Sequence, residues 1–316
     1  MALPNRALVT GCAGFIGSHL TDYLINNGVE VVGLDNLSTG NKENMECFFY
    51  SPKFTFVDSD IREYYSCVMA SEGVDAIFHQ AALCSVPESL EAPTKYHDMN
   101  VTGAFNIFEA ARINHVKRVV FASSAAVYGK TYGNIAPEGA EGNVLSPYAM
   151  SKKINELYAI MYNQIYNVPC IGLRYFNVYG PRQKVDSAYA SVIPIFIKTL
   201  LGGGQCTIYG DGEQTRDFIY VSDVVTANVM ACQARIFSDY QIFNIATGKG
   251  STVNTVYQDV CHALKIDRNP IYEPKRDGDL LHSVAFIDNA ALYLGYTPSV
   301  GLDEGIYETV EWYKNK

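Results

Sequence analysis

Apolar residues in this chain form short unbroken runs that alternate with longer segments of mixed polarity. Runs of this length are typical of strands buried on both faces of a parallel sheet. Six of them predict strands at 7–9, 30–35, 54–57, 76–79, 118–122 and 169–174. The segments 18–25, 94–114 and 147–167 carry apolar positions at helical spacing. The alternation predicts an α/β fold with a doubly wound, Rossmann-like parallel sheet.

The pattern loosens after Arg174, where short apolar runs, turns and short helical segments follow one another without regular alternation. We therefore expect two lobes, a larger one over residues 1–173 and a smaller mixed α/β one over 174–316. A segment near 218–247 is expected to cross back and extend the main sheet.

Three glycines follow the first predicted strand with the spacing G-x-x-G-x-x-G, at Gly11, Gly14 and Gly17. Glycine permits a tight turn and close approach of backbone amides to a pyrophosphate at a helix N-terminus. An acid, Asp35, ends the next strand, where it would bind the adenosine ribose hydroxyls and repel a 2′-phosphate. The alternative for Asp35 is an ordinary turn residue. The context predicts a dinucleotide site for NAD rather than NADP.

A phenol and an ammonium, Tyr148 and Lys152, are spaced i and i+4 on a predicted helix and so share a face. A nearby cation and the positive nicotinamide ring would lower the tyrosine pKa by roughly one to three units. This spacing also arises by chance on amphipathic helices. Ser123 and Ser124, at the end of the fifth predicted strand, favour the chemical interpretation. The three residue types beside NAD predict removal of a proton from an alcohol during hydride transfer.

Composition narrows the range of partners. The 316 residues carry a net charge of −9 and are 48% hydrophobic and 18% charged. This balance argues against nucleic-acid or anionic-membrane binding, although a few arginines in a pocket can still hold an anionic substrate. The eight scattered cysteines show neither a C-x-x-C pair nor a metal-ligand cluster, so we expect reduced thiols, no metal and a cytoplasmic location. We expect no signal peptide or membrane span.

These motifs resemble the extended short-chain dehydrogenase/reductase family, and within it the nucleotide-sugar 4-epimerases. The resemblance covers nearly the whole chain. It runs through residues 10–20, 35–40, 79–82, 123–129, 146–152, 174–183 and 210–218. It implies that the larger lobe binds NAD and the smaller one a UDP-sugar, with Tyr148 as base, Ser124 orienting the sugar hydroxyl and Lys152 holding the nicotinamide ribose.

The resemblance also implies the remaining ligands of NAD. They are Gly11, Gly14, Phe15, Ile16, Gly17, Asp35, Asn36, Ser38, Thr39, Gly40, Asp60, Ile61, Gln80, Ala81, Ala82, Asn100, Ser123, Tyr148, Lys152 and Tyr175. Sugar dehydratases and decarboxylases of the family carry acids directly after the catalytic serine or threonine. This chain has Ala125 and Ala126 there, which favours a redox-neutral 4-epimerase working through a 4-keto intermediate.

For the substrate, the resemblance implies diphosphate binding by Asn177, Arg216 and Arg276, ribose binding by Asp279, uracil stacking by Tyr209 and sugar contact by Ser85. Tyr209 could equally be a core residue. Family members restricted to UDP-glucose and UDP-galactose have a tyrosine where this chain has Ser283, so a UDP-N-acetylglucosamine/UDP-N-acetylgalactosamine epimerase is favoured. The alternative is a UDP-glucose 4-epimerase or an enzyme that accepts both sugar classes. The family further implies a homodimer through the helices at 94–114 and 147–167.

Overall fold

A seven-stranded parallel sheet forms the centre of the protein in the computed structural model, which describes residues 2–129, 135–185, 191–235, 241–275 and 281–316. The strand order is β12-β7-β5-β4-β1-β2-β3. The strands are β1 (Arg6–Thr10), β2 (Glu30–Asp35), β3 (Phe54–Asp58), β4 (Ala76–His79), β5 (Arg118–Ser124), β7 (Cys170–Tyr175) and β12 (Ile242–Ile245). All six predicted strands are present, and the predicted doubly wound α/β class is confirmed.

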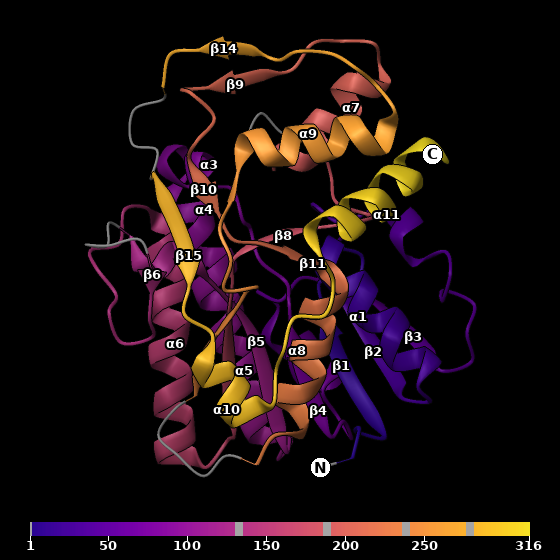
Figure 1. The fold of residues 1–316 in the computed structure, drawn as a ribbon. Coiled ribbons are helices and arrows are strands. Elements are labelled where there is room, and N and C mark those ends of the chain that lie inside the picture. The colour runs from indigo at the N-terminus through magenta and orange to yellow at the C-terminus, as the bar shows by residue number, and fades with distance from the viewer. Residues whose placement is uncertain (1, 130–134, 186–190, 236–240, 276–280) are drawn as a thin grey trace.

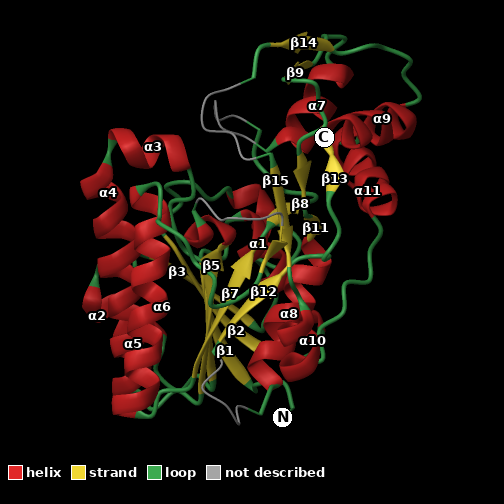
Figure 2. Ribbon diagram, turned by 60° about the vertical axis from the view of Figure 1, so that its left-hand side comes forward, coloured by secondary structure: helices red, strands yellow, loops and turns green. Residues whose placement is uncertain are grey.

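Helices cover both faces of this sheet, giving the three layers seen edge-on in Figure 2. One face is covered by α1 (Phe15–Asn26), α8 (Val221–Gln233) and α10 (Asp288–Leu294). The other is covered by α2 (Tyr64–Ala70), α5 (Gly103–Ile113) and α6 (Pro147–Tyr166). Each face has its own apolar core, because strands buried on both sides present side chains alternately to the two helix layers.

The helix predicted over 94–114 is divided. Its residues fall in α4 (Pro93–His97), a π-helical turn η2 (Asp98–Thr102) and α5. The turn contains Asn100, whose buried side-chain amide binds both backbone groups of Leu83. Turns of this kind are frequent at functional sites, and this one fixes the segment that follows β4.

Shorter elements lie beyond the carboxyl ends of the central strands (Figure 1). They form a four-stranded sheet and two strand pairs, beside three helices with a separate apolar core. These elements are β13 (Ser251–Thr252), β10 (Thr215–Arg216), β15 (His282–Ala285) and β6 (Ile135–Ala136); β8 (Asn177–Tyr179) with β11 (Phe218–Tyr220); β9 (Thr207–Tyr209) with β14 (Ile271–Glu273); and α7 (Val192–Leu201), α9 (Val253–Leu264) and α11 (Leu302–Lys314). The short helical segments are η1 (Lys42–Met45), α3 (Val86–Glu91) and η3 (Ala125–Tyr128).

β12 lies beside β7 at one edge of the central sheet, after the chain has passed through several of the shorter elements. The assignment of residues 1–173 and 174–316 to separate lobes stays a prediction. Within the described ranges, no helix is long and apolar enough to cross a bilayer, and no group of three His, Cys, Asp or Glu side chains is arranged to hold a metal ion. All eight cysteines are free thiols.

Candidate active site

The glycine turn after β1 leaves no room for larger residues. Gly11 has φ +72°, a region that side chains with a Cβ rarely adopt, and a Cβ there would lie 2.8 Å from the backbone nitrogen of Ala81. At Gly14 a Cβ would lie 3.1 Å from the carbonyl oxygen of Gly11. The turn therefore brings bare backbone to the N-terminus of α1, an arrangement suited to a pyrophosphate.

Asp35 is buried at the end of β2, beside this turn. Its Oδ2 accepts a hydrogen bond from the Ala13 amide at 3.0 Å, and its Oδ1 accepts one from the Leu37 amide at 2.8 Å. Burial raises the pKa of Asp35 above its ordinary value, while these two amides oppose the rise. Each oxygen keeps a lone pair, so the carboxylate can also accept ribose hydroxyls.

A cavity of about 660 Å³ runs from the glycine turn to the first turn of α6. Nineteen of the predicted site residues line it: Gly11, Gly14, Phe15, Ile16, Gly17, Asp35, Asn36, Ser38, Thr39, Ile61, Gln80, Ala81, Ala82, Ser85, Ser123, Ser124, Tyr148, Lys152 and Tyr175. Its length, its bare backbone turn and its acid at the end of β2 fit the pyrophosphate and adenosine of a dinucleotide.

Three residues predicted to bind the cofactor do not line the cavity. Asp60 forms an ion pair with Arg62 at 2.8 Å and accepts a hydrogen bond from Asn36, which does line it. The side-chain amide of Asn100 is hydrogen-bonded to Leu83 and Ser151. Gly40 packs too closely against Ala13 for a Cβ, at 2.8 Å. These three residues contact residues close to the cavity and do not border it themselves. Their predicted contacts with NAD stay predictions.

Tyr148 and Lys152 lie one turn apart on α6, whose N-terminus is capped by Ser146. Both side chains are nearly fully buried within the protein and border the cavity. The Lys152 ammonium donates to the carbonyl of Ala122 at 2.9 Å and lies 6.0 Å from the centre of the Tyr148 ring. Since Ala122 belongs to β5, this bond fixes α6 to the strand that carries the two serines.

The two serines have different partners, which separates their roles. Ser123 donates a 2.6 Å hydrogen bond to Glu156 on α6. The Ser124 hydroxyl accepts from the amide of Ala126 and is also hydrogen-bonded to the phenol of Tyr148. The serine whose hydroxyl reaches Tyr148 is therefore Ser124, the residue chosen from the sequence.

Electrostatics in the protein alone oppose ionisation of the phenol. Burial raises the pKa of Tyr148, the Cys84 thiol adds to the rise, and the hydrogen bond with Ser124 lowers it. Burial also lowers the pKa of Lys152. The predicted lowering of the tyrosine pKa therefore needs the positive charge of the oxidised nicotinamide, and it stays a prediction for the NAD-bound protein.

A buried ionic network holds α6 against the sheet. The Arg174 guanidinium on β7 donates to both oxygens of Glu156, at 2.7 and 2.8 Å, and also pairs with Glu141 at 2.5 Å. Burial lowers the pKa of Arg174, but Glu156, Tyr128 and Glu141 together raise it above its ordinary value. Because Ser123 binds the same carboxylate, β5, α6 and β7 meet at this point.

The predicted substrate residues that the structure describes come from separate elements. Asn177 begins β8, Tyr209 ends β9, Arg216 ends β10 and Ser283 lies on β15. Arg216 and Ser283 are register partners on parallel neighbouring strands. None of the four is among the residues that line the cavity, although Phe176 and Val178, on either side of Asn177, are.

Two further predicted ligands, Arg276 and Asp279, lie outside the described residues.

One side of the cavity is lined by residues that were not predicted as site residues: Arg182, Gln183, Lys184 and Ser191. Arg182 pairs with Asp22 of α1 at 3.0 Å, and the Pro181 carbonyl is hydrogen-bonded to His19 of the same helix at 2.9 Å. These bonds hold the segment after β8 across the glycine turn. The signal in the sequence was that Arg182 and Gln183 end the 174–183 motif that carries the resemblance.

A second carboxylate also borders the cavity. Glu88 of α3 pairs with Lys95 at 2.7 Å and accepts from the Tyr96 hydroxyl. Lys95 and Tyr96 lower the pKa of Glu88, so it stays ionised and is a poor proton donor at neutral pH. Ala125 and Ala126 begin η3 directly after Ser124. The site therefore combines a phenol, a hydroxyl and an ammonium without an acid adjacent to the serine.

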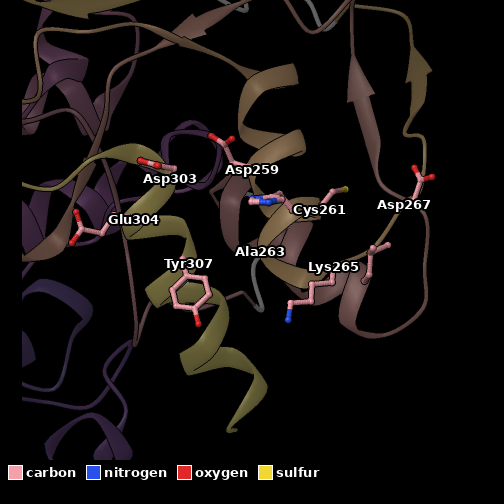
Figure 3. Close-up of a pocket in the computed structure, with 10 residues that line it drawn as sticks. Asp259, Cys261, Ala263, Lys265, Asp267, Asp303, Glu304 and Tyr307 are labelled. Atoms are coloured by element: carbon pink, nitrogen blue, oxygen red, sulfur yellow. The ribbon is translucent and has the colours of Figure 1, made fainter.

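A second groove lies between α9 and α11 (Figure 3). Its wall includes the acids Asp259, Asp303 and Glu304, and none of the predicted site residues borders it. We therefore locate the candidate active site in the cavity at the carboxyl ends of the central strands.

Comparison with known proteins agrees with this arrangement. Residues 7–246 match the model of the NAD dependent epimerase/dehydratase family. The chain belongs to this family. Its cofactor is NAD, in keeping with the glycine turn and Asp35.

Several relatives match over nearly their full length. A UDP-glucose 4-epimerase of Mycolicibacterium smegmatis is 40% identical over 313 residues, covering 98% of this chain and 99% of the relative. The structure of a UDP-N-acetylglucosamine 4-epimerase from Methanobrevibacter ruminantium in complex with UDP-N-acetylmuramic acid superposes with a TM-score of 0.94 at 36% identity, covering 99% of each chain. A Thermus thermophilus UDP-glucose 4-epimerase in complex with NAD gives a TM-score of 0.86 at 37% identity, covering 98% of this chain and 99% of that one.

Proposed function

We propose that this enzyme is a UDP-sugar 4-epimerase that interconverts UDP-N-acetylglucosamine and UDP-N-acetylgalactosamine. The relatives that support the reaction carry 4-epimerase names and match over nearly their full lengths. The redox-neutral chemistry is supported by Ala125 and Ala126, which occupy the positions where dehydration would need an acid.

NAD held at the glycine turn would supply hydride-transfer chemistry at sugar C4. The chain's own residues handle the proton. Tyr148 removes it from the 4-hydroxyl, Ser124 orients that hydroxyl, and Lys152 holds the nicotinamide ribose while anchored to β5. Gly11, Gly14 and the N-terminus of α1 would hold the pyrophosphate of NAD. Oxidation and reduction at one carbon need no further acid.

The diphosphate of the sugar nucleotide requires cations. We propose that Arg216 and Arg276 bind it, with Asn177 as a hydrogen-bond donor. Asp279 is proposed to bind the uridine ribose, and Tyr209 to stack on the uracil. Removing a guanidinium from such a contact costs about 1.5–3 kcal/mol, so Arg216→Ala should weaken UDP binding without releasing NAD.

The observation that carries the choice of sugar is the small residue Ser283. A serine leaves room for an equatorial 2-acetamido group, and its hydroxyl can accept the amide N–H. One pocket contact discriminates by about 1–3 kcal/mol, so the preference should be graded unless a clash is created. Ser283→Tyr would create that clash.

The test is to incubate purified protein with each of the four UDP-sugars and to separate the products by chromatography. We expect conversion of the acetamido sugars, and Ser283→Tyr should suppress it while sparing the plain hexoses. Ser222→Tyr, at an exposed serine on α8, is the matched control. Equal losses for both sugar classes in Ser283→Tyr would contradict the role of Ser283.

A second candidate is a UDP-glucose/UDP-galactose epimerase or an enzyme of dual specificity. It is favoured by the name of the 40% identical relative. In that case Ser283 merely fails to exclude the larger sugars, and the wild-type enzyme converts the plain hexoses at least as fast as the acetamido sugars.

We also propose a homodimer formed through α5 and α6. Met150 and Leu157, one heptad apart on α6, are 46% and 58% exposed, and Phe105 on α5 is 38% exposed. An apolar face of this kind is costly to leave in water. Light scattering coupled to size-exclusion chromatography should give twice the monomer mass of 34.9 kDa, and Leu157→Glu should give the monomer.

A further inference from the structure

One fully buried carboxylate, that of Asp217, joins the segment after β12 to β15, the strand that carries the proposed substrate ligand Ser283. It lies between β10 and β11 and is 0% exposed. Its Oδ1 accepts from the amide and the hydroxyl of Thr247, at 2.8 and 2.6 Å. Its Oδ2 accepts from the amides of Gly248 and Ala285, at 2.9 and 3.2 Å. Each oxygen therefore binds two donors.

These donors come from different parts of the fold. Thr247 and Gly248 follow β12, the edge strand of the central sheet, whereas Ala285 belongs to β15. The carboxylate thus attaches β15 to the rim of the central sheet. Figure 1 shows β15 running from the shorter elements down towards α10.

The backbone of Asp217 extends the same junction. Its amide donates to the carbonyl of Ser283 at 2.9 Å, and its carbonyl accepts from the backbone amide and the side-chain amide of Asn177, at 3.1 and 3.0 Å. Arg216 precedes it in the chain and is the register partner of Ser283. Three of the proposed substrate ligands, Asn177, Arg216 and Ser283, are therefore adjacent or directly bonded to Asp217.

A buried carboxylate is costly to maintain. Burial raises the pKa of Asp217 above its ordinary value, and the donors from Thr247, Ala285 and Gly248 oppose the rise. All four partners are donors, so only an ionised carboxylate satisfies them together. An asparagine in its place would turn an NH₂ group towards two of these donors and leave them unpaired. β15 would then be held less firmly against the segment after β12.

We propose that Asp217 is a positioning residue for UDP-sugar binding, holding Asn177, Arg216 and Ser283 in register around the substrate diphosphate and sugar. The inference rests on the proposed function. Because Asp217 acts on the substrate side of the site, its loss should weaken UDP binding and leave bound NAD unchanged.

The experiment compares Asp217→Asn with Asp223→Asn. Asp223 is a matched control, because it is also buried and accepts from the amide and hydroxyl of Ser299 and the amide of Val300, with no contact to the proposed ligands. For each protein one measures the Tm, the NAD content, the Kd for UDP by calorimetry, and kcat and KM.

We expect both variants to lower the Tm. Asp217→Asn should raise the Kd for UDP and the KM about tenfold or more, with kcat and NAD content within threefold of wild type, while Asp223→Asn should leave the Kd unchanged. Should Asp217→Asn fail to fold, Thr247→Val keeps the carboxylate and removes one donor, and a two- to fivefold rise in Kd is expected.

Equal Kd values for UDP in wild type and the folded Asp217 or Thr247 variant would overturn the proposal, as would loss of NAD together with kcat. The two proposals can fail separately. A wild-type protein that binds UDP but converts no UDP-sugar refutes the epimerase assignment, while the Kd comparison still tests Asp217. A wild-type protein that does not bind UDP refutes both.

Discussion

Replacing Glu156 by glutamine tests how much the buried network contributes to stability. Glu156 and Arg174 are both nearly inaccessible, at 1% and 2% exposure, and the carboxylate accepts from Arg174, from Ser123 and, at 3.5 Å, from Lys153. A glutamine keeps one acceptor oxygen. Its NH₂ group would face a donor, because both carboxylate oxygens accept in the native protein.

The expected cost follows from what Arg174 retains. Removing one partner of a buried pair typically costs 3–5 kcal/mol. Arg174 keeps Glu141 and the Tyr128 hydroxyl, so we expect the lower end, about 3 kcal/mol, equivalent to a Tm decrease on the order of 5 °C in a chain of this size.

The control is Glu109→Gln, which removes an equally short pair with Arg112 on the surface of α5. Arg112 is 39% exposed, so this pair should contribute no more than about 1 kcal/mol. Urea unfolding monitored by circular dichroism at saturating NAD compares the two, because ligand binding shifts the transition equally. Equal destabilisation by the two substitutions would refute the reasoning from burial.

Three further predictions concern the site and its surroundings. Tyr148→Phe should retain NAD, but its kcat, measured by product formation, should fall by at least about a hundredfold. Near-normal activity would show that Tyr148 is not the base. Gly11→Ala should purify without NAD, measured by chromatography of the released nucleotide, because its Cβ would lie 2.8 Å from the Ala81 backbone nitrogen. Gly295→Ala, at a glycine with a similar φ of +73° but with open space around it, should retain NAD. Burial lowers the pKa of His79 from 6.5 to about 3, so the stability contributed by its neutral form is complete above pH 6.5 and lost as pH falls towards 3. The Tm should decrease over that range, and a His79→Asn variant with an equal slope would contradict this.

Much of the fold could be predicted because it depends on neighbours in sequence. The apolar runs predict strands, since each strand is buried on both faces, and the glycine spacing predicts the turn, since only glycine fits it. The four-residue spacing of Tyr148 and Lys152 puts both on one helical face. None of these inferences needs knowledge of distant contacts.

The rest was decided by contacts between residues far apart in the chain. Only the family resemblance separates Ser123 from Ser124 in the sequence. In the structure Glu156, 33 residues after Ser123, binds Ser123, and Ser124 is hydrogen-bonded to Tyr148. Asp60 and Asn100 are polar residues near the site that bind other parts of the protein. Asp60 pairs with Arg62, and the Asn100 amide is hydrogen-bonded to Leu83.

The sequence by itself determined the order of the strands up to β7, the backbone turn suited to a dinucleotide, and the shared face of Tyr148 and Lys152, because these follow from local sterics and periodicity. Only the tertiary structure decided that the segment around Arg182 closes one side of the cavity and that Arg216 and Ser283 stand in register. The physical reason is that a buried polar group forms hydrogen bonds with whichever groups lie next to it in the folded chain. A local sequence pattern does not say which groups those are.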